Sequence, residues 1–73
     1  MFLDQTKENL SYNVISIVDG REIKLKLTSM GIYPNVTITI IKNDHFGPLI
    51  IAIKASRISL GRGLSKKIKV EEK

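Results

Sequence analysis

Five short runs rich in branched aliphatic residues, separated by turn-forming or polar residues, limit most strongly how this 73-residue chain can fold. Val, Ile and Thr suit the pleated, half-buried surface of a sheet, and such runs bounded by Gly, Pro, Asn or Asp are typical of short strands. Five twisted strands in an open sheet would leave unpaired edges, which closure into a barrel removes. We therefore expect a small five-stranded barrel, with strands at Val14–Val18, Val36–Ile40, Leu49–Ile53, Ile58–Leu60 and Ile68–Val70.

One segment has the periodicity of a helix instead of a strand. Ile23, Leu27 and Met30 are spaced i, i+4 and i+7, which places their side chains on one face of an amphipathic helix over residues 21–30. Gly31 follows directly, and glycine is favoured just after a helix because it adopts a left-handed conformation without strain. The pattern therefore predicts one helix that packs its apolar face on the barrel.

The ends of the helical segments can also be placed. Asp19, with Glu22 three residues later, resembles a capping box at the start of the helix. A short helical turn is expected between Leu60 and the last strand, because Leu64 continues the spacing of Leu60 by four residues. The expected fold class is mainly β: one small SH3-like five-stranded barrel domain over residues 1–73, with one amphipathic helix and a short helical turn.

Leu25 breaks the pattern of the predicted helix. It points away from the apolar stripe and stands between Lys24 and Lys26, so we expect it to face solvent. A single exposed Leu is ordinary on a protein surface. It is nevertheless the best candidate for an apolar contact with a partner, and we take Lys24, Leu25 and Lys26 as the candidate partner-binding residues.

The chain lacks the groups that enzymes use. It has one His and no Cys, and its carboxylates form no spaced pair on one predicted face. The glycine-containing stretch Gly61–Ser65 lacks the Lys-Ser/Thr pair of a phosphate-binding loop. We therefore expect no catalytic residues, no cofactor-binding residues, no small-molecule substrate and no enzymatic activity.

Asp44 and His45 are the only adjacent residues of metal-ligand type. A site for Fe²⁺ or Zn²⁺ normally takes three or four ligands from different elements. A single His in a predicted hairpin loop over residues 43–48 is expected to be an exposed loop residue. Binding of a transition metal ion at Asp44 and His45 would require subunits to share the site, as in a metal-responsive regulator.

The net charge of +5 is unevenly distributed. Acidic and basic residues balance in residues 1–41, so the whole excess lies in residues 42–73. Such a bias can attract nucleic acid, an acidic membrane face or an acidic protein. A nucleic-acid-binding barrel is therefore an alternative, but the four aromatic residues are spread out and do not predict a stacking platform.

Three stretches, Ile23–Asn35, Gly47–Pro48 and Ile58–Val70, resemble the FeoA family. Its members are small cytoplasmic accessory proteins of bacterial ferrous iron uptake. The family pattern is a helix that ends in a basic residue, Leu, three further residues and Gly-Ile or Gly-Leu, followed by Pro-Gly. The resemblance extends from Leu3 to Val70 and rests on the order and spacing of these pieces.

Five residues depart from that family pattern. Asn9 and Asn35 stand where glycine is usual, and Asn tolerates the left-handed turns that such positions require. Thr6 replaces a usual Leu, Lys26 a common Arg and Leu25 a polar residue. These last differences bear on how the N-terminal segment packs and on whether the partner surface matches that of the family.

The resemblance implies an SH3-like barrel, no enzymatic activity and a partner in the FeoB-type ferrous iron permease, a membrane protein with a cytoplasmic GTP-binding domain. It also implies a cytoplasmic location, with recruitment to the inner face of the membrane. No apolar run is long enough for a membrane span and no signal peptide is apparent, in keeping with this expectation. The oligomeric state stays open, a homo-oligomer included.

Overall fold

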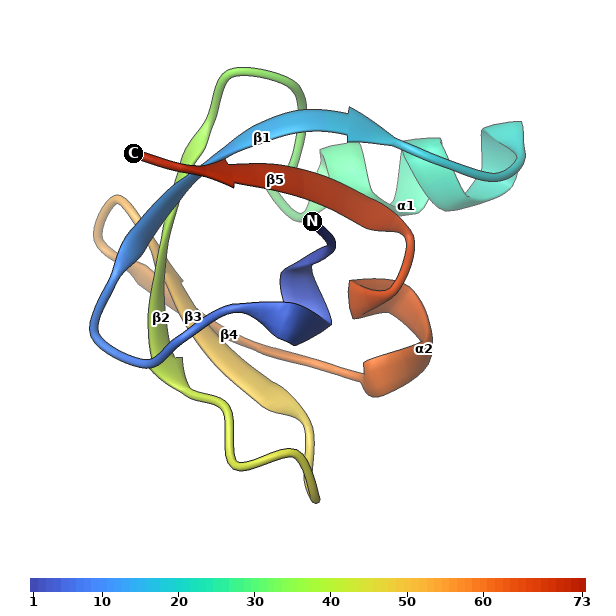
Figure 1. Ribbon diagram of the computed structural model, residues 1–73. Helices are drawn as coiled ribbons and strands as arrows, with labels where there is room; N and C mark the ends of the chain where they lie inside the picture. The colour runs from blue at the N-terminus through green and yellow to red at the C-terminus, as the bar shows by residue number, and fades with distance from the viewer.

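The computed structural model describes all residues 1–73 as one five-stranded antiparallel sheet with two helices and a 3₁₀ turn (Figure 1). The strand order is β4-β3-β2-β1-β5. This confirms the predicted five strands, the helix and the short helical turn. In chain order the elements are η1 (Leu3–Gln5), β1 (Ser11–Ile17), α1 (Arg21–Ser29), β2 (Thr37–Lys42), β3 (Leu49–Ile53), β4 (Ser56–Leu60), α2 (Arg62–Ser65) and β5 (Ile68–Glu72).

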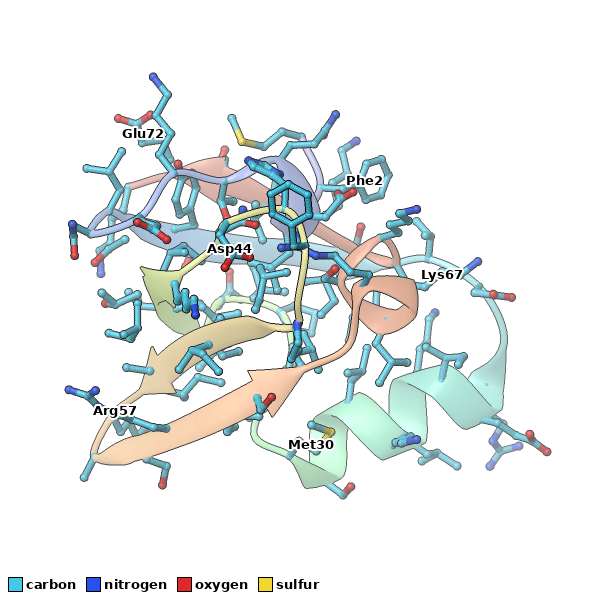
Figure 2. All side chains as sticks on the ribbon, turned by 90° about the horizontal axis from the view of Figure 1, so that it is seen from below. Phe2, Met30, Asp44, Arg57, Lys67 and Glu72 are labelled. Carbon is cyan, nitrogen blue, oxygen red and sulfur yellow. The ribbon has the colours of Figure 1, made fainter.

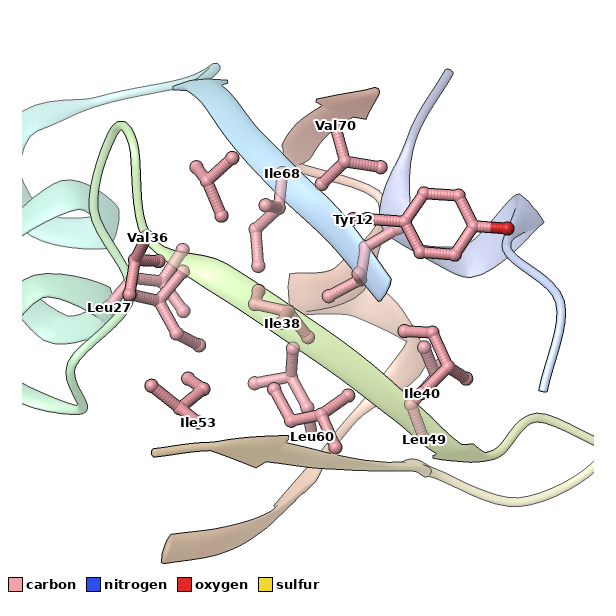
Figure 3. Packing of buried hydrophobic residues seen from close by; sticks show 14 of the residues in the cluster. Tyr12, Leu27, Val36, Ile38, Ile40, Leu49, Ile53, Leu60, Ile68 and Val70 are labelled. Carbon is pink, nitrogen blue, oxygen red and sulfur yellow. The ribbon is translucent and has the colours of Figure 1, made fainter. Parts of the chain in front are cut away.

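The sheet curls around one core of 15 buried apolar side chains (Figure 3). Alternation decides which side chains enter it: Leu49, Ile51 and Ile53 of β3 are buried, whereas the residues between them are half-buried on the outer face. In β2, Ile38 and Ile40 point inward and the threonines outward. None of the helices is long and apolar enough to cross a membrane.

The two ends of the sheet, β4 and β5, do not pair with each other. The free side of β5 is instead covered by the N-terminal residues, since Phe2 forms a bridge with Lys69 and the Val70 amide donates to the Met1 carbonyl at 2.8 Å. The turn η1 also contacts α2, so these two short elements fill the space between β5 and β4 (Figure 1). The barrel is therefore completed by the N-terminal segment and not by strand pairing.

Helix α1 docks on the core through its predicted stripe. Leu27 is fully buried, and Ile23 and Met30 pack against the core cluster. At the C-terminal end, Gly31 has a φ of +89° and the Ile32 amide donates to the Leu27 carbonyl at 2.9 Å. This is a Schellman motif, and the burial of Ile32 supplies its usual apolar contact with the last turn.

The predicted capping box at the start of α1 is wrong. Gly20 is the N-cap residue and receives no side-chain cap, whereas Asp19 lies outside the helix with a φ of +91°. The Asp19 carboxylate accepts the Gly20 amide at 2.8 Å and pairs with Lys67 Nζ at 3.0 Å. It is therefore engaged by its own turn and by the segment before β5, so it does not reach the amides of the first helical turn.

The N-terminal segment is held by a buried polar contact that the sequence did not indicate. Asn43 is 6% exposed, and its side-chain amide donates to the carbonyl oxygens of Thr6 at 2.7 Å and Asp4 at 3.2 Å. The Asn43 backbone amide donates to the Glu8 carboxylate at 2.7 Å. Thr6 itself is buried and donates to the Leu3 carbonyl. Asn43, expected in a polar loop, therefore ties the loop after β2 to residues 4–8.

Strand β1 starts three residues earlier than expected, at Ser11. Its first residues alternate: Tyr12 and Val14 are buried, whereas Ser11 and Asn13 lie on the outer face. Leu3 is fully buried and anchors the N-terminal segment. The prediction that Asn9 and Asn35 adopt left-handed turns is confirmed, since both have positive φ.

Candidate functional site

The predicted partner-binding residues lie on the exposed side of α1. Leu25 is 60% exposed, and Lys24 and Lys26 are exposed as well. This confirms the predicted exposure of Leu25. Residues 21, 22, 28 and 29, one helical turn before and after Leu25, are also exposed and polar or charged. Leu25 is therefore an isolated apolar side chain on a charged helix face.

The three residues do not all face the same way, because successive positions on a helix differ by about 100°. Lys24 lines a hollow of about 160 Å³ between α1 and β1, together with Ser16, Ile17, Thr28 and Pro34. Lys24 therefore borders β1, whereas Leu25 points to solvent. We call the exposed residues Lys24, Leu25 and Lys26 the α1 surface.

The candidate metal ligands lie in the loop between β2 and β3, where Figure 2 labels Asp44. The Asp44 Oδ1 atom accepts the backbone amides of Phe46 at 3.1 Å and Gly47 at 3.3 Å, and Oδ2 lies 3.6 Å from Lys42 Nζ. His45 is exposed, with a φ of +69°. The Asp44 carboxylate is thus occupied in holding the turn.

This loop does not fit a metal ion. Nowhere in residues 1–73 do three or more His, Cys, Asp or Glu side chains come close enough together to hold one. Asp44 and His45 are adjacent in sequence, but no third ligand of these types stands beside them. We therefore derive no chemistry through Fe²⁺ or Zn²⁺ bound to these residues.

The amides of Phe46 and Gly47 lower the pKa of the Asp44 carboxyl below 3.8, and Lys42 contributes a smaller effect. A lowered folded-state pKa stabilises the fold above the unfolded value and is lost as the pH falls through the folded value. We expect the Asp44 carboxyl to titrate below pH 3.8 in a carboxyl NMR titration. Asp44→Asn keeps an acceptor oxygen but cannot titrate. As the pH falls from 5 to 2, this variant should therefore lose less thermal stability than the unchanged chain. Titration at or above 3.8 would mean that the two hydrogen bonds do not persist in solution.

A larger hollow, of about 460 Å³, lies on the outer face of β2 and β3. We call it the threonine pocket. The side chains of Thr37 and Thr39 lie on the outer face of the sheet. Ala52 pairs with Thr39 across β2 and β3, and Lys54 directly follows β3. Its lining contains no carboxylate and consists of Tyr33, Pro34, Asn35, Val36, Thr37, Thr39, Ala52 and Lys54.

No pattern in the sequence alone predicted this pocket. The alternation in Val36–Ile40 placed the threonines outward, but the pairing of β2 with β3 decides that Ala52 and Lys54 stand beside them. A small residue at position 52, between two large aliphatic neighbours, is the one local sign of a recess.

Comparison with known proteins assigns the family by sequence, whereas likeness of fold alone also extends to a manganese-dependent transcriptional repressor at 20% identity. Residues 1–72 match the FeoA domain family. Over 66 residues, 90% of this chain and 79% of the relative, the sequence is 47% identical to a Methanocaldococcus jannaschii protein that bears the provisional name Fe(2+) transport protein A.

Solved structures agree with this assignment. A crystal structure of the iron uptake regulatory protein FeoA superposes with a TM-score of 0.94 at 29% identity, covering 100% of this chain and 97% of that one. Stenotrophomonas maltophilia FeoA, described as a prokaryotic SH3 domain protein and crystallised with zinc, gives a TM-score of 0.84 at 20% identity, covering 97% and 89% of the two chains. At 20% identity, the similarity to Stenotrophomonas maltophilia FeoA supports the fold alone. That fold is mainly β and SH3-like, as predicted.

Proposed function

Because this chain belongs to the FeoA family, we propose that it acts in ferrous iron uptake by binding the cytoplasmic region of a FeoB-type permease. The family consists of transport accessory proteins and not of enzymes. The proposal places the chain in the cytoplasm, recruited to the inner face of the membrane by the permease. It requires a surface for another protein and no catalytic centre.

The α1 surface supports this proposal best. Helix α1 is anchored on the core by buried Leu27, and its C-terminal end is fixed by the Schellman motif, so the backbone that carries its exposed side chains is docked on the barrel. Leu25 gives an apolar contact, and its two lysine neighbours give positive charge on either side. Apolar anchors inside a charged rim are typical of protein interfaces.

Leu25→Glu should weaken binding to the cytoplasmic region of the permease by about tenfold, because the change removes an apolar contact and buries a charge. Isothermal titration calorimetry with the purified cytoplasmic region measures this. Phe46→Glu is the matched control: Phe46 is 93% exposed on the β2–β3 hairpin, away from α1 (Figure 1). Equal affinity of Leu25→Glu and the unchanged protein would remove the α1 surface from the proposal.

A further inference from the structure

The threonine pocket, on the outer face of the sheet, has a neighbour around the end of the sheet. A second hollow of about 170 Å³ adjoins it and shares Tyr33 and Lys54 with it. The second hollow lies between the end of α1 and β4, where Figure 2 shows Met30 next to β4. It is lined by Met30, Gly31, Tyr33, Ile53, Lys54, Ser56 and Ile58. Thr39 and Ala52 point outward, whereas Ile53 and Ile58 point toward the core, so the two hollows lie on opposite faces of the sheet and meet at its end, at Tyr33 and Lys54. We call this pair of hollows the two-part groove.

The two halves of the groove differ in chemistry. The threonine pocket is lined by the hydroxyl-bearing side chains of Thr37, Thr39 and Tyr33, of which Thr39 is hydrogen-bonded to Ser11 at 2.9 Å. The second hollow has apolar walls from Met30, Ile53 and Ile58. Neither half has a carboxylate in its lining.

Positive charge stands around the groove without acidic partners. Lys54, between the two halves, makes no ion pair, since the salt bridges of the molecule are Lys42 with Asp44 and Lys67 with Asp19. Lys73 Nζ donates to Thr37 Oγ1 at 2.9 Å and therefore stands at the edge of the threonine pocket. Arg57 is exposed opposite Ala52 on β4. Unpaired cations beside hydroxyl donors favour carboxylates as ligands.

We propose that the two-part groove binds an extended acidic segment of a partner protein, with a carboxylate near Lys54 and an aliphatic side chain between Met30 and Ile58. The proposal rests on the proposed function for the existence of a protein partner, but it assigns a surface separate from Leu25. A recessed groove does not suit a flat membrane surface. A single aromatic residue, Tyr33, gives no stacking platform for nucleic acid.

The test is an NMR titration of the ¹⁵N-labelled chain with the peptide acetyl-Glu-Glu-Leu-Glu-Glu-amide at low and moderate salt. Amide shifts should change mainly at residues that line the groove, among them Tyr33, Thr37, Ala52, Lys54 and Ile58. Lys54→Glu should weaken binding by about tenfold, since it places like charges together. Lys66→Glu is the matched control, because Lys66 is exposed, forms no ion pair and lies outside the groove.

Each outcome decides the proposal. Two results would overturn the proposal: shift changes spread equally over all exposed lysines, or equal peptide binding by Lys54→Glu and Lys66→Glu. Either would mean that the peptide is held by general charge attraction. Equal binding of a peptide with Ser in place of Leu would remove the apolar half. Stronger binding of oligothymidylate at the same amides would assign the groove to nucleic acid instead. The peptide assay contains no permease, so failure of Leu25→Glu to weaken permease binding would leave this result unchanged.

Discussion

Leu27→Ala is expected to lower the free energy of unfolding by about 3 kcal/mol, the typical cost of truncating a buried Leu. Leu27 is the one buried residue of α1, and its carbonyl accepts the Ile32 amide that ends the helix. Ile23 and Met30 are only partly buried beside it. Loss of Leu27 packing therefore weakens the attachment of the whole helix, not just one contact.

The measurement is urea denaturation followed by circular dichroism, compared with Leu25→Ala. The control makes the same chemical change on the same helix at an exposed position, and it should alter stability by less than about 0.5 kcal/mol. A chain of this size has a total stability of only about 4–11 kcal/mol, so the two variants are easily separated. Equal stability of the two variants would contradict the docking of α1 described above.

The loss of helix docking also has a functional consequence. Leu27→Ala should weaken partner binding although Leu27 contacts no partner, because the α1 surface depends on the docked helix for its position. Leu25→Ala should weaken binding without changing stability. The pair thus separates the residue that positions the surface from the residue proposed to make the contact.

Asn43→Asp is expected to destabilise the fold by about 3 kcal/mol at pH 7, although the two side chains have the same shape. The amide nitrogen of Asn43 donates to two carbonyl oxygens in a buried place. A carboxylate would instead face the carbonyl oxygens of Asp4 and Thr6 with negative charge and no proton to donate. Residues 4–8 would lose their attachment to the loop after β2.

The destabilisation by Asn43→Asp should depend on pH in a defined direction. Burial and the facing carbonyl groups raise the pKa of the introduced carboxyl in the folded state, so the cost appears as the pH rises above the unfolded value of about 3.9. Urea denaturation at pH 3.5 and pH 7, each compared with the unchanged chain at the same pH, measures it. Asn35→Asp is the matched control, because Asn35 is exposed and its side chain makes no hydrogen bond, and it should cost less than about 0.5 kcal/mol. A cost that is the same at both pH values would contradict the role of charge.

The sequence predicted those features of this protein that depend on near neighbours in the chain. The alternation in Val36–Ile40 indicates which face of a strand is apolar. The spacing of Ile23, Leu27 and Met30 indicates which face of a helix is apolar. The structure confirms both. Exposure of Leu25 follows from the same spacing. Gly31 and Asn35 were placed correctly because a positive φ is a local property of the chain.

Only the tertiary structure decided the features that join distant parts of the chain. Asn43 contacts residues nearly 40 positions away, and no pattern around it in the sequence distinguishes a buried clamp from a polar loop residue. Asp19 turned to Lys67 and not to the helix, because the segment before β5 lies beside it. The two-part groove combines α1, β2, β3 and β4 through strand register and helix docking. The short-range periodicities of this sequence therefore determined the elements and their buried faces, whereas long-range pairing determined which surface side chains stand together.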